Sequence, residues 1–540
     1  TACPAHIAVQ GYLKLAAQGK YREALALIKR ENPFPAVCGR ICNRRCEDAC
    51  TRGTVDQAVA IDEVKRFIAQ QDLDAETRFV PEKVIPKVDG EFTEKIAIIG
   101  GGPAGMSCAY YLAEKGYRPT VFEKESRPGG MLMNGIPSFR LEKDVVEAEI
   151  DVLRQLGVEF RCGVEVGKDI TIQQLREQGY KGFYVAVGLQ SGGRLPVPGG
   201  DAAGVEAGID FMRRVNSGAD VKLTGRVVVI GGGNIAADVA RTAMRCGADS
   251  VSLYCLEAYD EMPMGEEDRT ECEREDIAVH AGFGPVEVSA ENGRAVSVTF
   301  KKCLRVKDEQ GRFAPVYDES VLQMAPCDTV LFCIGQKVEW KELLAGTQVE
   351  FNPNGTAKAD PVTYQTAEPD VFVGGDVYTG QKFAIDAIAA GKQGAVSLHR
   401  FVQGATLTIG RDRRQFIELD KKNALIAVDS YDSTPRQRVG YNEALRRTFR
   451  DERIAFTEAQ VKAETARCLG CGASVVDPNK CIGCGVCTTK CAFDAIHLHR
   501  ERPECSTMYA CEDKMKAILP YMVKREIKIK KAARRAKKAK

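Results

Sequence analysis

Lys95-Ile-Ala-Ile-Ile-Gly100-Gly-Gly-Pro-Ala-Gly105 is the stretch that decides the fold. Its β-branched run predicts a strand, and the glycines predict a tight turn that leads into a helix. The first glycine of such a turn permits the bend, the second lets the backbone approach a pyrophosphate, and the third lets the helix pack on the sheet. The next strand, Pro119 to Glu123, ends in an acid that is placed to accept a hydrogen bond from a ribose 2′-hydroxyl. A glycine turn without a ligand is the alternative.

A second unit of this kind begins about 130 residues later, with Arg226-Val-Val-Val-Ile-Gly231-Gly-Gly-Asn-Ile-Ala236. Two such units in one chain predict a protein that holds two dinucleotides against each other. The strand that follows runs from Ser250 to Glu257. A carboxylate at its end favours NAD(H) over NADP(H), because a 2′-phosphate calls for Arg. The alternative is that Glu257 is a solvated loop acid.

The composition narrows the class of protein. A chain of 540 residues, 44% of them apolar, suits three to four domains, and a net charge of +2 gives no field that would favour nucleic acid. No stretch approaches 18 uninterrupted apolar residues, so we expect no membrane span, and the amino terminus has no secretory pattern. Of the 21 cysteines, five fall in residues 3–50 and eight in residues 468–511. Such bunching favours metal-binding thiolates in a reducing cytosol over disulfides, so we expect a cytoplasmic protein.

The order of the elements predicts an α/β fold with two dinucleotide-binding, Rossmann-like domains. Because Asp370 to Asp376 and a helical run to Phe401 follow the second unit, we expect the second domain to be inserted in the first. Helical periodicity in residues 5–30 and 55–68 predicts a small helical cysteine domain before them.

Several motifs carry a resemblance to a known family. They are Gly129-Gly-Met-Leu-Met-Asn-Gly135-Ile-Pro-Ser-Phe-Arg140, Val371-Phe-Val-Gly-Gly-Asp376, Gly231-Gly-Gly-Asn-Ile-Ala-Ala-Asp238 and Glu261-Met-Pro263. They resemble the small subunit of glutamate synthase and its relatives, among them the amino-terminal half of dihydropyrimidine dehydrogenase and the flavoprotein of ferredoxin-linked transhydrogenases. The resemblance implies FAD at the first site, with Asp376 at the ribityl chain, and NAD(H) or NADP(H) at the second. Many relatives carry paired Arg where this chain has Leu256-Glu257, so their NADP preference is not carried over.

The pattern and the resemblance together predict the residues that bind the two dinucleotides. They are Gly100, Gly102, Pro103, Ala104, Gly105, Glu123, Lys124, Gly130, Met131, Gly135, Arg140, Gly188, Gly231, Gly233, Asn234, Ile235, Ala236, Asp238, Glu257, Gly335, Gly375 and Asp376.

The amino-terminal cysteines recur every four residues at Cys38, Cys42, Cys46 and Cys50, with Cys3 upstream. A [4Fe–4S] cubane needs four ligands, usually thiolates. The resemblance implies Cys3, Cys42 and Cys46 as ligands of one cubane and Cys50 as a ligand of a second. The upstream Cys-x-x-Cys of the relatives is absent, and their Gln or Glu ligand falls near Lys65, which cannot serve while protonated. Cys50 or Cys38 could replace that ligand, and zinc is the alternative metal.

The carboxy-terminal cysteines Cys481, Cys484, Cys487 and Cys491 have the spacing of bacterial ferredoxins, C-x2-C-x2-C-x3-C. In two-cluster ferredoxins the fourth cysteine binds the other cluster. Cys468-x-x-Cys471 is available to supply ligands of that second cluster, and Cys505 and Cys511 are weaker candidates for its remaining ligands. Arg467-Cys-Leu-Gly-Cys-Gly also looks like the motif that is missing from the amino-terminal domain. We therefore expect at least two [4Fe–4S] clusters in the chain. The predicted metal ligands are Cys3, Cys42, Cys46, Cys50, Cys468, Cys471, Cys481, Cys484, Cys487 and Cys491.

These modules give the predicted domain order. It is a helical Fe–S domain, residues 1–75; a first segment of the FAD-binding domain, 95–225; an NAD(P)-binding domain, 226–345; a second segment of the FAD-binding domain, 346–405; a linker, 406–466; a ferredoxin-like 4Fe–4S α+β module, 467–512; and a basic tail, 513–540.

The predicted function is electron transfer. Hydride would pass between NAD(P)H, with NADH favoured, and FAD, and single electrons through the clusters to or from ferredoxin or partner subunits. The resemblance also allows electron bifurcation in a transhydrogenase-type complex. We expect no catalytic side chain, because the cofactors carry the chemistry. The alternatives are an NAD(P)H-oxidising small subunit of glutamate synthase and a non-catalytic scaffold.

Overall fold

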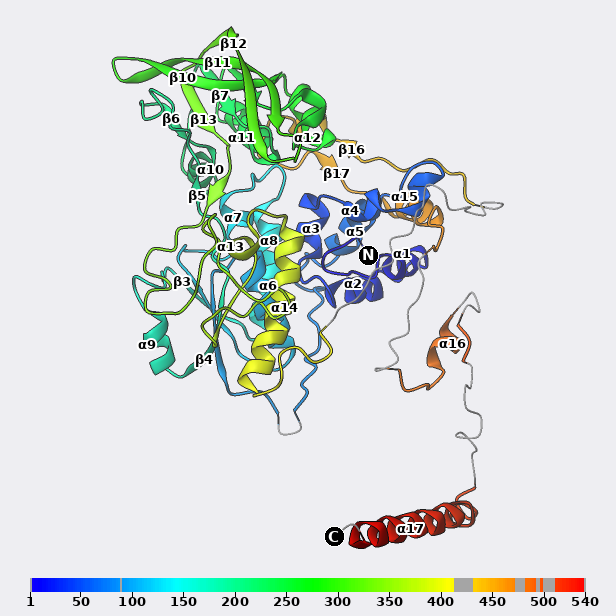
Figure 1. Cartoon of the computed structure of the whole chain (residues 1–540). Helices are drawn as coiled ribbons and strands as arrows, with labels where there is room; N and C mark the ends of the chain where they lie inside the picture. Colours follow the sequence, from blue (N-terminus) through cyan, green and yellow to red (C-terminus); the bar gives the residue numbers. More distant parts are fainter. Residues whose placement is uncertain are drawn as a thin grey trace. The chain divides into compact units, whose positions relative to one another are not determined.

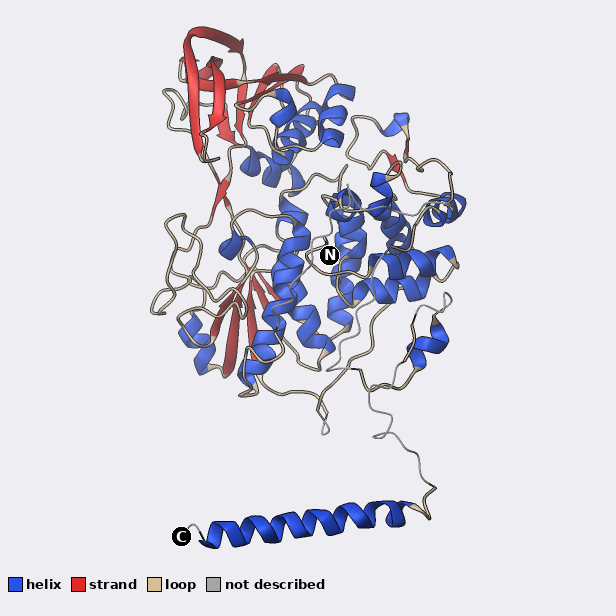
Figure 2. Ribbon diagram, turned by 45° about the vertical axis from the view of Figure 1, so that its right-hand side comes forward, coloured by secondary structure: helices blue, strands red, loops and turns tan. Residues whose placement is uncertain are grey.

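The computed structural model describes residues 2–87, 90–411, 431–471, 481–491, 496–498 and 510–538. The chain divides into two compact units, Thr1–Cys471 and Gly472–Lys540. The first unit holds both predicted nucleotide domains and the helical domain, and Figures 1 and 2 show its sheets and helices.

The first sheet of this unit has five strands in the order β15-β4-β1-β2-β3, and every pairing is parallel. The strands are β1 (Lys95–Ile99), β2 (Thr120–Glu123), β3 (Glu159–Cys162), β4 (Tyr180–Val185) and β15 (Val371–Val373). Parallel sheets of this kind are covered on both faces, which explains why β1, β2 and β4 are buried almost throughout.

The second sheet repeats this design in the order β6-β13-β7-β8-β9, again with parallel pairings only. Its strands are β6 (Val205–Ala207), β7 (Arg226–Ile230), β8 (Ser250–Cys255), β9 (Ala278–Ala281) and β13 (Thr329–Phe332). Since β15 returns to the first sheet after β13, the second domain is inserted in the first, which confirms the predicted fold class. β6 belongs to this second sheet, since it pairs with β13. It nevertheless lies before residue 226, the predicted start of the inserted domain.

An antiparallel sheet projects from the inserted domain, at the top of Figure 1. It consists of β10 (Phe283–Glu291), β11 (Arg294–Lys307) and β12 (Phe313–Pro326). Phe300 and Val298 of β11 are fully buried in one core with Val228 of β7, so this sheet packs on the parallel one.

Helices α6 (Pro103–Glu114) and α11 (Asn234–Arg245) begin immediately after the two glycine turns. α14 (Ala384–Val402) packs along α6, as Figure 1 shows. Gly391 makes this approach possible, since a Cβ there would overlap the Ala104 carbonyl oxygen. The returning segment is therefore held to the first turn by close backbone packing.

The helical domain contains α1 (Val9–Ala17), α2 (Tyr21–Lys29), α3 (Pro35–Ile41), α4 (Arg45–Asp48) and α5 (Ile61–Gln70). Glu149 of α8 (Lys143–Gln155) joins it to the first sheet by accepting hydrogen bonds from the amides of Ala36 and Val37, at 2.8 and 3.0 Å. These are the first amides of α3, which have no partner within the helix. Burial raises the pKa of Glu149 to about 7.

The predicted linker contains helices and strands in residues 431–466. These residues form the two-strand pair β16 (Gly440–Tyr441) and β17 (Arg453–Ile454) and the helix α15 (Glu458–Ala466), which packs on α1. Phe456 and Val461 are buried in the core of the helical domain, and ion pairs such as Arg66–Asp451 and Arg436–Glu47 add polar anchors. Polar contacts of this kind leave no apolar periodicity in the sequence.

The second unit contains α16 (Val486–Lys490) and α17 (Lys514–Lys538) among its described residues. None of the described helices combines the length and the apolar composition that a membrane-spanning segment needs.

Candidate functional site

A cavity of about 560 Å³ lies between the two glycine turns. It is lined by residues of both nucleotide domains and by Ile41 of the helical domain. The predicted binding residues that line it are Gly100, Gly102, Pro103, Ala104, Glu123, Lys124, Gly130, Met131, Gly135, Arg140, Gly188, Gly233, Asn234, Ile235, Asp238, Gly335, Gly375 and Asp376. Gly105, Gly231, Ala236 and Glu257 are not among the residues that line it.

The glycines of the first turn have different roles. Gly100 has φ +104° and a Cβ there would lie 2.5 Å from the Ala186 carbonyl oxygen, while a Cβ on Gly105 would overlap the Gly100 carbonyl. Gly102 has an ordinary φ of −77°, and its nearest obstacle is the Cα of Gly130 at 4.0 Å. Gly100 and Gly105 are therefore required by the fold, whereas Gly102 leaves open space where a phosphate group could approach.

The second turn shows the same division. Gly231 has φ +149°, and a Cβ there would overlap the Cys333 carbonyl oxygen. A Cβ on Gly233 would have no atom within 4 Å, and φ is −96°. Gly233 is thus the open glycine of the inserted domain.

Each predicted ribose acid lies against its own turn. Glu123 accepts hydrogen bonds from the amides of Gly101 (2.7 Å) and Glu125 (2.9 Å), and burial raises its pKa despite these bonds. A Cβ on Gly101 would lie 3.0 Å from Glu123 Oε2, and one on Gly232 would lie 2.9 Å from Glu257 Oε2. Half-buried Glu257 therefore occupies in the second unit the place that Glu123 occupies in the first.

Asp376 begins α13 (Asp376–Thr379) at the cavity wall. Its Oδ1 accepts a hydrogen bond from the Lys382 amide at 3.3 Å. Burial raises the pKa of Asp376 to about 6. A half-buried carboxylate with one bonded oxygen leaves acceptor capacity for a ligand hydroxyl.

Arg140 and Asp238, both predicted to bind cofactor, contact each other. Arg140 Nε lies 2.6 Å from Asp238 Oδ1, and its Nη2 lies 2.5 Å from Asp268 Oδ1. Arg140 belongs to the first domain, and the two acids belong to the inserted domain. The guanidinium therefore holds the two nucleotide domains together at the edge of the cavity.

Replacing Arg140 by Met should destabilise the protein by about 3–5 kcal/mol, because two largely buried carboxylates would lose their charged partner. The measurement is urea unfolding of the purified protein. Lys358→Met, which removes the exposed Lys358–Glu350 pair, is the control and should change the free energy of unfolding by less than about 1 kcal/mol. Equal stabilities of the Arg140→Met and unchanged proteins would contradict the bridging role.

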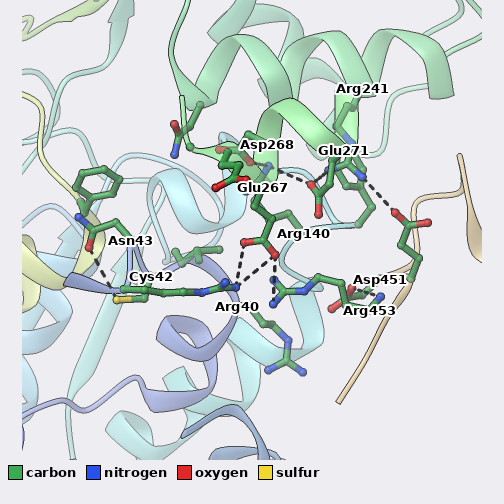
Figure 3. A pocket seen from close by; sticks show the side chains of 18 of the residues that line it. Arg40, Cys42, Asn43, Arg140, Arg241, Glu267, Asp268, Glu271, Asp451 and Arg453 are labelled. Carbon is green, nitrogen blue, oxygen red and sulfur yellow. Dashed lines mark hydrogen bonds and ion pairs between the residues drawn. The ribbon is translucent and has the colours of Figure 1, made fainter. Parts of the chain in front are cut away.

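A second pocket, of about 320 Å³, adjoins the first and is shown in Figure 3. Residues 40–44 of the helical domain line one side of this pocket, and α12 (Glu266–Arg274) lines another. Arg453 enters it from β17. Glu267 pairs with Arg44 at 3.1 Å and with Arg453 at 3.6 Å. Ile41 lines both pockets, and its neighbour Cys42 lines the second. Sequence reasoning missed Ile41, which no motif marks.

Two of the predicted amino-terminal ligands, Cys42 and Cys46, lie near Lys65. The Lys65 ammonium lies 2.5 Å from Asp62 Oδ1 and faces Cys42 and Cys38. Burial alone would lower the pKa of Lys65, but Asp62 and these thiols outweigh burial and hold the pKa well above its usual value. Lys65 therefore stays protonated and offers no lone pair to iron.

The thiols of Cys42 and Cys46 are half-buried. Burial raises the pKa of Cys42 and raises that of Cys46 to about 12, and each of these thiols is further affected by a neighbouring one, Cys3 for Cys42 and Cys42 for Cys46. Thiols with raised pKa values are protonated near neutral pH, so the binding of a metal by their thiolates releases protons to solvent. Within the described ranges, no group of three or more His, Cys, Asp or Glu side chains is arranged to hold a single metal ion. The cysteines that bind a [4Fe–4S] cubane lie further apart than those that bind a single ion, because each thiolate binds a different iron.

The carboxy-terminal cysteines divide between the two units. Cys468 and Cys471 belong to the first unit, whereas Cys481, Cys484, Cys487 and Cys491 belong to the second. The predicted module 467–512 therefore crosses the border between the units. Cys505 lies outside the described residues.

Three family models match the chain. The model of pyridine nucleotide-disulphide oxidoreductases covers residues 94–393, more than half of the 540 residues. The chain belongs to this family. The model of dihydropyrimidine dehydrogenase domain II, 4Fe-4S cluster, matches residues 1–77 of this oxidoreductase, and a 4Fe-4S binding domain matches residues 474–497.

Curated relatives agree with these matches. The β subunit of NADP(+)-dependent formate dehydrogenase from Moorella thermoacetica is 35% identical and covers 87% of this chain and 69% of its own. The NAD-dependent dihydropyrimidine dehydrogenase subunit PreT of Escherichia coli K12 is 33% identical over 75% of this chain and 90% of its own. The glutamate synthase [NADPH] small chain of Halomonas elongata is 34% identical over 72% and 85%. The resemblance seen in the sequence is thereby confirmed.

Among solved structures, FprA of Mycobacterium tuberculosis in complex with NADPH has a TM-score of 0.50 and covers 58% of this chain and 85% of its own. At 17% identity this likeness shows the fold alone. The family models and relatives together identify an NAD(P)H-dependent FAD/iron–sulfur oxidoreductase, with FAD, NAD(P)H and [4Fe–4S] clusters as its cofactors. They decide against zinc and against a non-catalytic scaffold.

Proposed function

We propose that this oxidoreductase passes hydride between NADH and FAD, and passes single electrons from the flavin site through [4Fe–4S] clusters to or from ferredoxin or partner subunits. The observation that carries the proposal is the position of Ile41 and Cys42. Ile41 lines the cavity between the two glycine turns, and the next residue is a predicted cluster ligand. A flavin is the group that accepts two electrons together and releases them one at a time.

The residues present fit the two dinucleotides. Gly102 and Gly233 leave space at the amino termini of α6 and α11, where the helix dipoles favour phosphate. Glu123, Glu257 and Asp376 supply carboxylate oxygens for hydroxyls. Arg140 holds the two domains to each other, and the chain's role in the reaction is to bind, to orient and to exclude water.

The test is an anaerobic titration with NADH in which flavin and cluster absorbance are followed together. We expect the flavin band to bleach and the cluster band to change within the same titration. Bleaching of the flavin with no change in any cluster signal would overturn the proposed electron path, although it would leave hydride transfer in place.

Glu257 supports the preference for NADH. Its carboxylate suits a free 2′-hydroxyl and would repel a 2′-phosphate. We expect Glu257→Arg to lower the ratio of NADH to NADPH kcat/KM for flavin reduction by at least about tenfold, or ~1.4 kcal/mol. Glu257→Gln is the matched control, since it removes the charge without supplying a cation, and should move the ratio less. An unchanged ratio in Glu257→Arg would contradict the assignment.

The share of this chain that each relative covers supports the proposal that the chain is a subunit of a larger complex. The formate dehydrogenase β subunit and the NADPH-Fe(3+) oxidoreductase β subunit of Geobacter sulfurreducens each cover 87% of this chain, against 72% for the Halomonas elongata glutamate synthase small chain. We therefore propose an electron-relay subunit in the cytoplasm, with electron bifurcation as one mode of the complex. Glutamate formation on addition of a glutamate synthase large subunit would favour the alternative.

A further inference from the structure

Cys468 comes within electrostatic range of Cys50, although 417 residues separate them in the sequence. Cys471 and Lys14 also come within electrostatic range of Cys468. Cys468 and Cys50 pack against the same core of the helical domain. The sequence left two alternatives for Cys468 and Cys471, the ferredoxin-like module or the place of the motif that is missing from the helical domain. The structure places Cys468 at the helical domain.

A buried polar network fixes this position. Arg52 Nη1 donates to the Arg467 carbonyl oxygen at 3.0 Å, and Arg467 Nη2 donates to the Gln57 carbonyl oxygen at 2.6 Å. Glu464 Oε1 pairs with Arg467 at 2.6 Å and accepts from the Ala60 amide at 2.8 Å. Arg52, Arg467 and Glu464 are at most 1% exposed. Residue 467 is therefore locked beside residue 52, and the cysteines next to them are brought to one place.

The local backbone also suits a ligand sulfur. Gly470 adopts φ +61°, and its amide donates a hydrogen bond to the Cys468 sulfur. Amide hydrogen bonds to the sulfurs are one of the means by which proteins tune iron–sulfur clusters. The positive charge of Lys14 adds compensation for the negative charge of a cluster with thiolate ligands.

We propose that Cys50, Cys468 and Cys471 together bind one [4Fe–4S] cluster. The amino-terminal 4Fe-4S match ends at residue 77 and the carboxy-terminal match begins at residue 474, so neither contains all three cysteines. This cluster is separate from the site of Cys3, Cys42 and Cys46 around Lys65, and from the site of Cys481, Cys484 and Cys487. The three thiolates bind three of the four irons, and another donor binds the fourth.

The test uses the full-length protein, purified without oxygen. Cys50→Ser, Cys468→Ser and Cys471→Ser should each lose one cluster, about four iron atoms per chain, and each should lose the same signal in the electron paramagnetic resonance spectrum of the reduced protein. Cys484→Ser is the matched control, and should lose a different signal. The Cys50→Ser/Cys468→Ser double variant should lose no more iron than either single variant. Cys468→Ser/Cys484→Ser should lose two clusters.

Retained FAD shows that a variant has folded, because none of the three cysteines lines the cavity between the glycine turns. If Cys50→Ser does not fold, Cys471→Ser still tests the proposal, because Cys471 is exposed and its replacement should not disturb the fold. Loss of the Cys484 signal in Cys468→Ser would overturn the proposal by assigning Cys468 to the ferredoxin-like module. Full iron content in Cys468→Ser and Cys471→Ser would overturn it by showing that neither is a ligand. Neither result would affect hydride transfer to FAD.

Discussion

We expect the Gly102→Val variant to be purified without bound FAD but with its iron–sulfur clusters. The backbone at Gly102 has φ −77°, which any residue adopts, and a Cβ there has only the Gly130 Cα within 4.0 Å. Valine therefore fits the folded chain, but its methyl groups occupy the space where the turn should meet a pyrophosphate. We expect FAD affinity to fall by at least about 100-fold, or ~2.7 kcal/mol, within the usual effect of overpacking.

The measurement is the flavin absorbance per chain, with iron content as the sign of a folded protein. Gly105→Val is the contrasting variant, because its Cβ would overlap the Gly100 carbonyl oxygen and should prevent folding of the first nucleotide domain. A yellow Gly102→Val protein with one FAD per chain would show that the first turn does not bind the flavin.

Gly233→Val should keep FAD and lose reduction by NADH. A Cβ on Gly233 has no atom within 4 Å, and φ is −96°, so the inserted domain should fold normally. The side chain would fill the open end of the second turn, where the nucleotide pyrophosphate should lie. We expect kcat/KM with NADH to fall at least about 100-fold, by the same overpacking argument.

Dithionite supplies the control for this variant, since it should still bleach the flavin and so prove that the flavin site is intact. Gly231→Val would not be a clean test, because φ +149° and the overlap with the Cys333 carbonyl would disturb the fold itself. Undiminished NADH-dependent bleaching in Gly233→Val would mean that the nucleotide binds elsewhere. Gly102→Val and Gly233→Val serve as controls for each other.

The two glycine turns were predictable because all their constraints are local. A strand, a bend that needs Gly100 or Gly231, and a helix within a dozen residues leave few other folds. The return of β15 to the first sheet was also predictable, since a third strand of this type follows the second unit. The place of β6 was not, because its partner β13 lies more than 100 residues further along the chain.

The same contrast holds for charged residues at the site. Arg140 and Asp238 were both predicted to bind cofactor from their motifs, yet their side chains pair with each other across the two domains. Ile41, which lines both pockets, belongs to no motif and was found only from the folded chain.

By itself, the sequence determined that this chain carries two dinucleotide turns and two groups of thiolate ligands, because short spacings fix which atoms can meet within one turn or loop. Only the tertiary structure decided which cysteines of the two groups stand together. Cys468 reaches Cys50 through buried contacts of Arg52, Glu464 and Arg467, and the Arg52–Arg467 bond joins residues 415 positions apart. Such contacts depend on how whole helices pack, and no local pattern of residues encodes them.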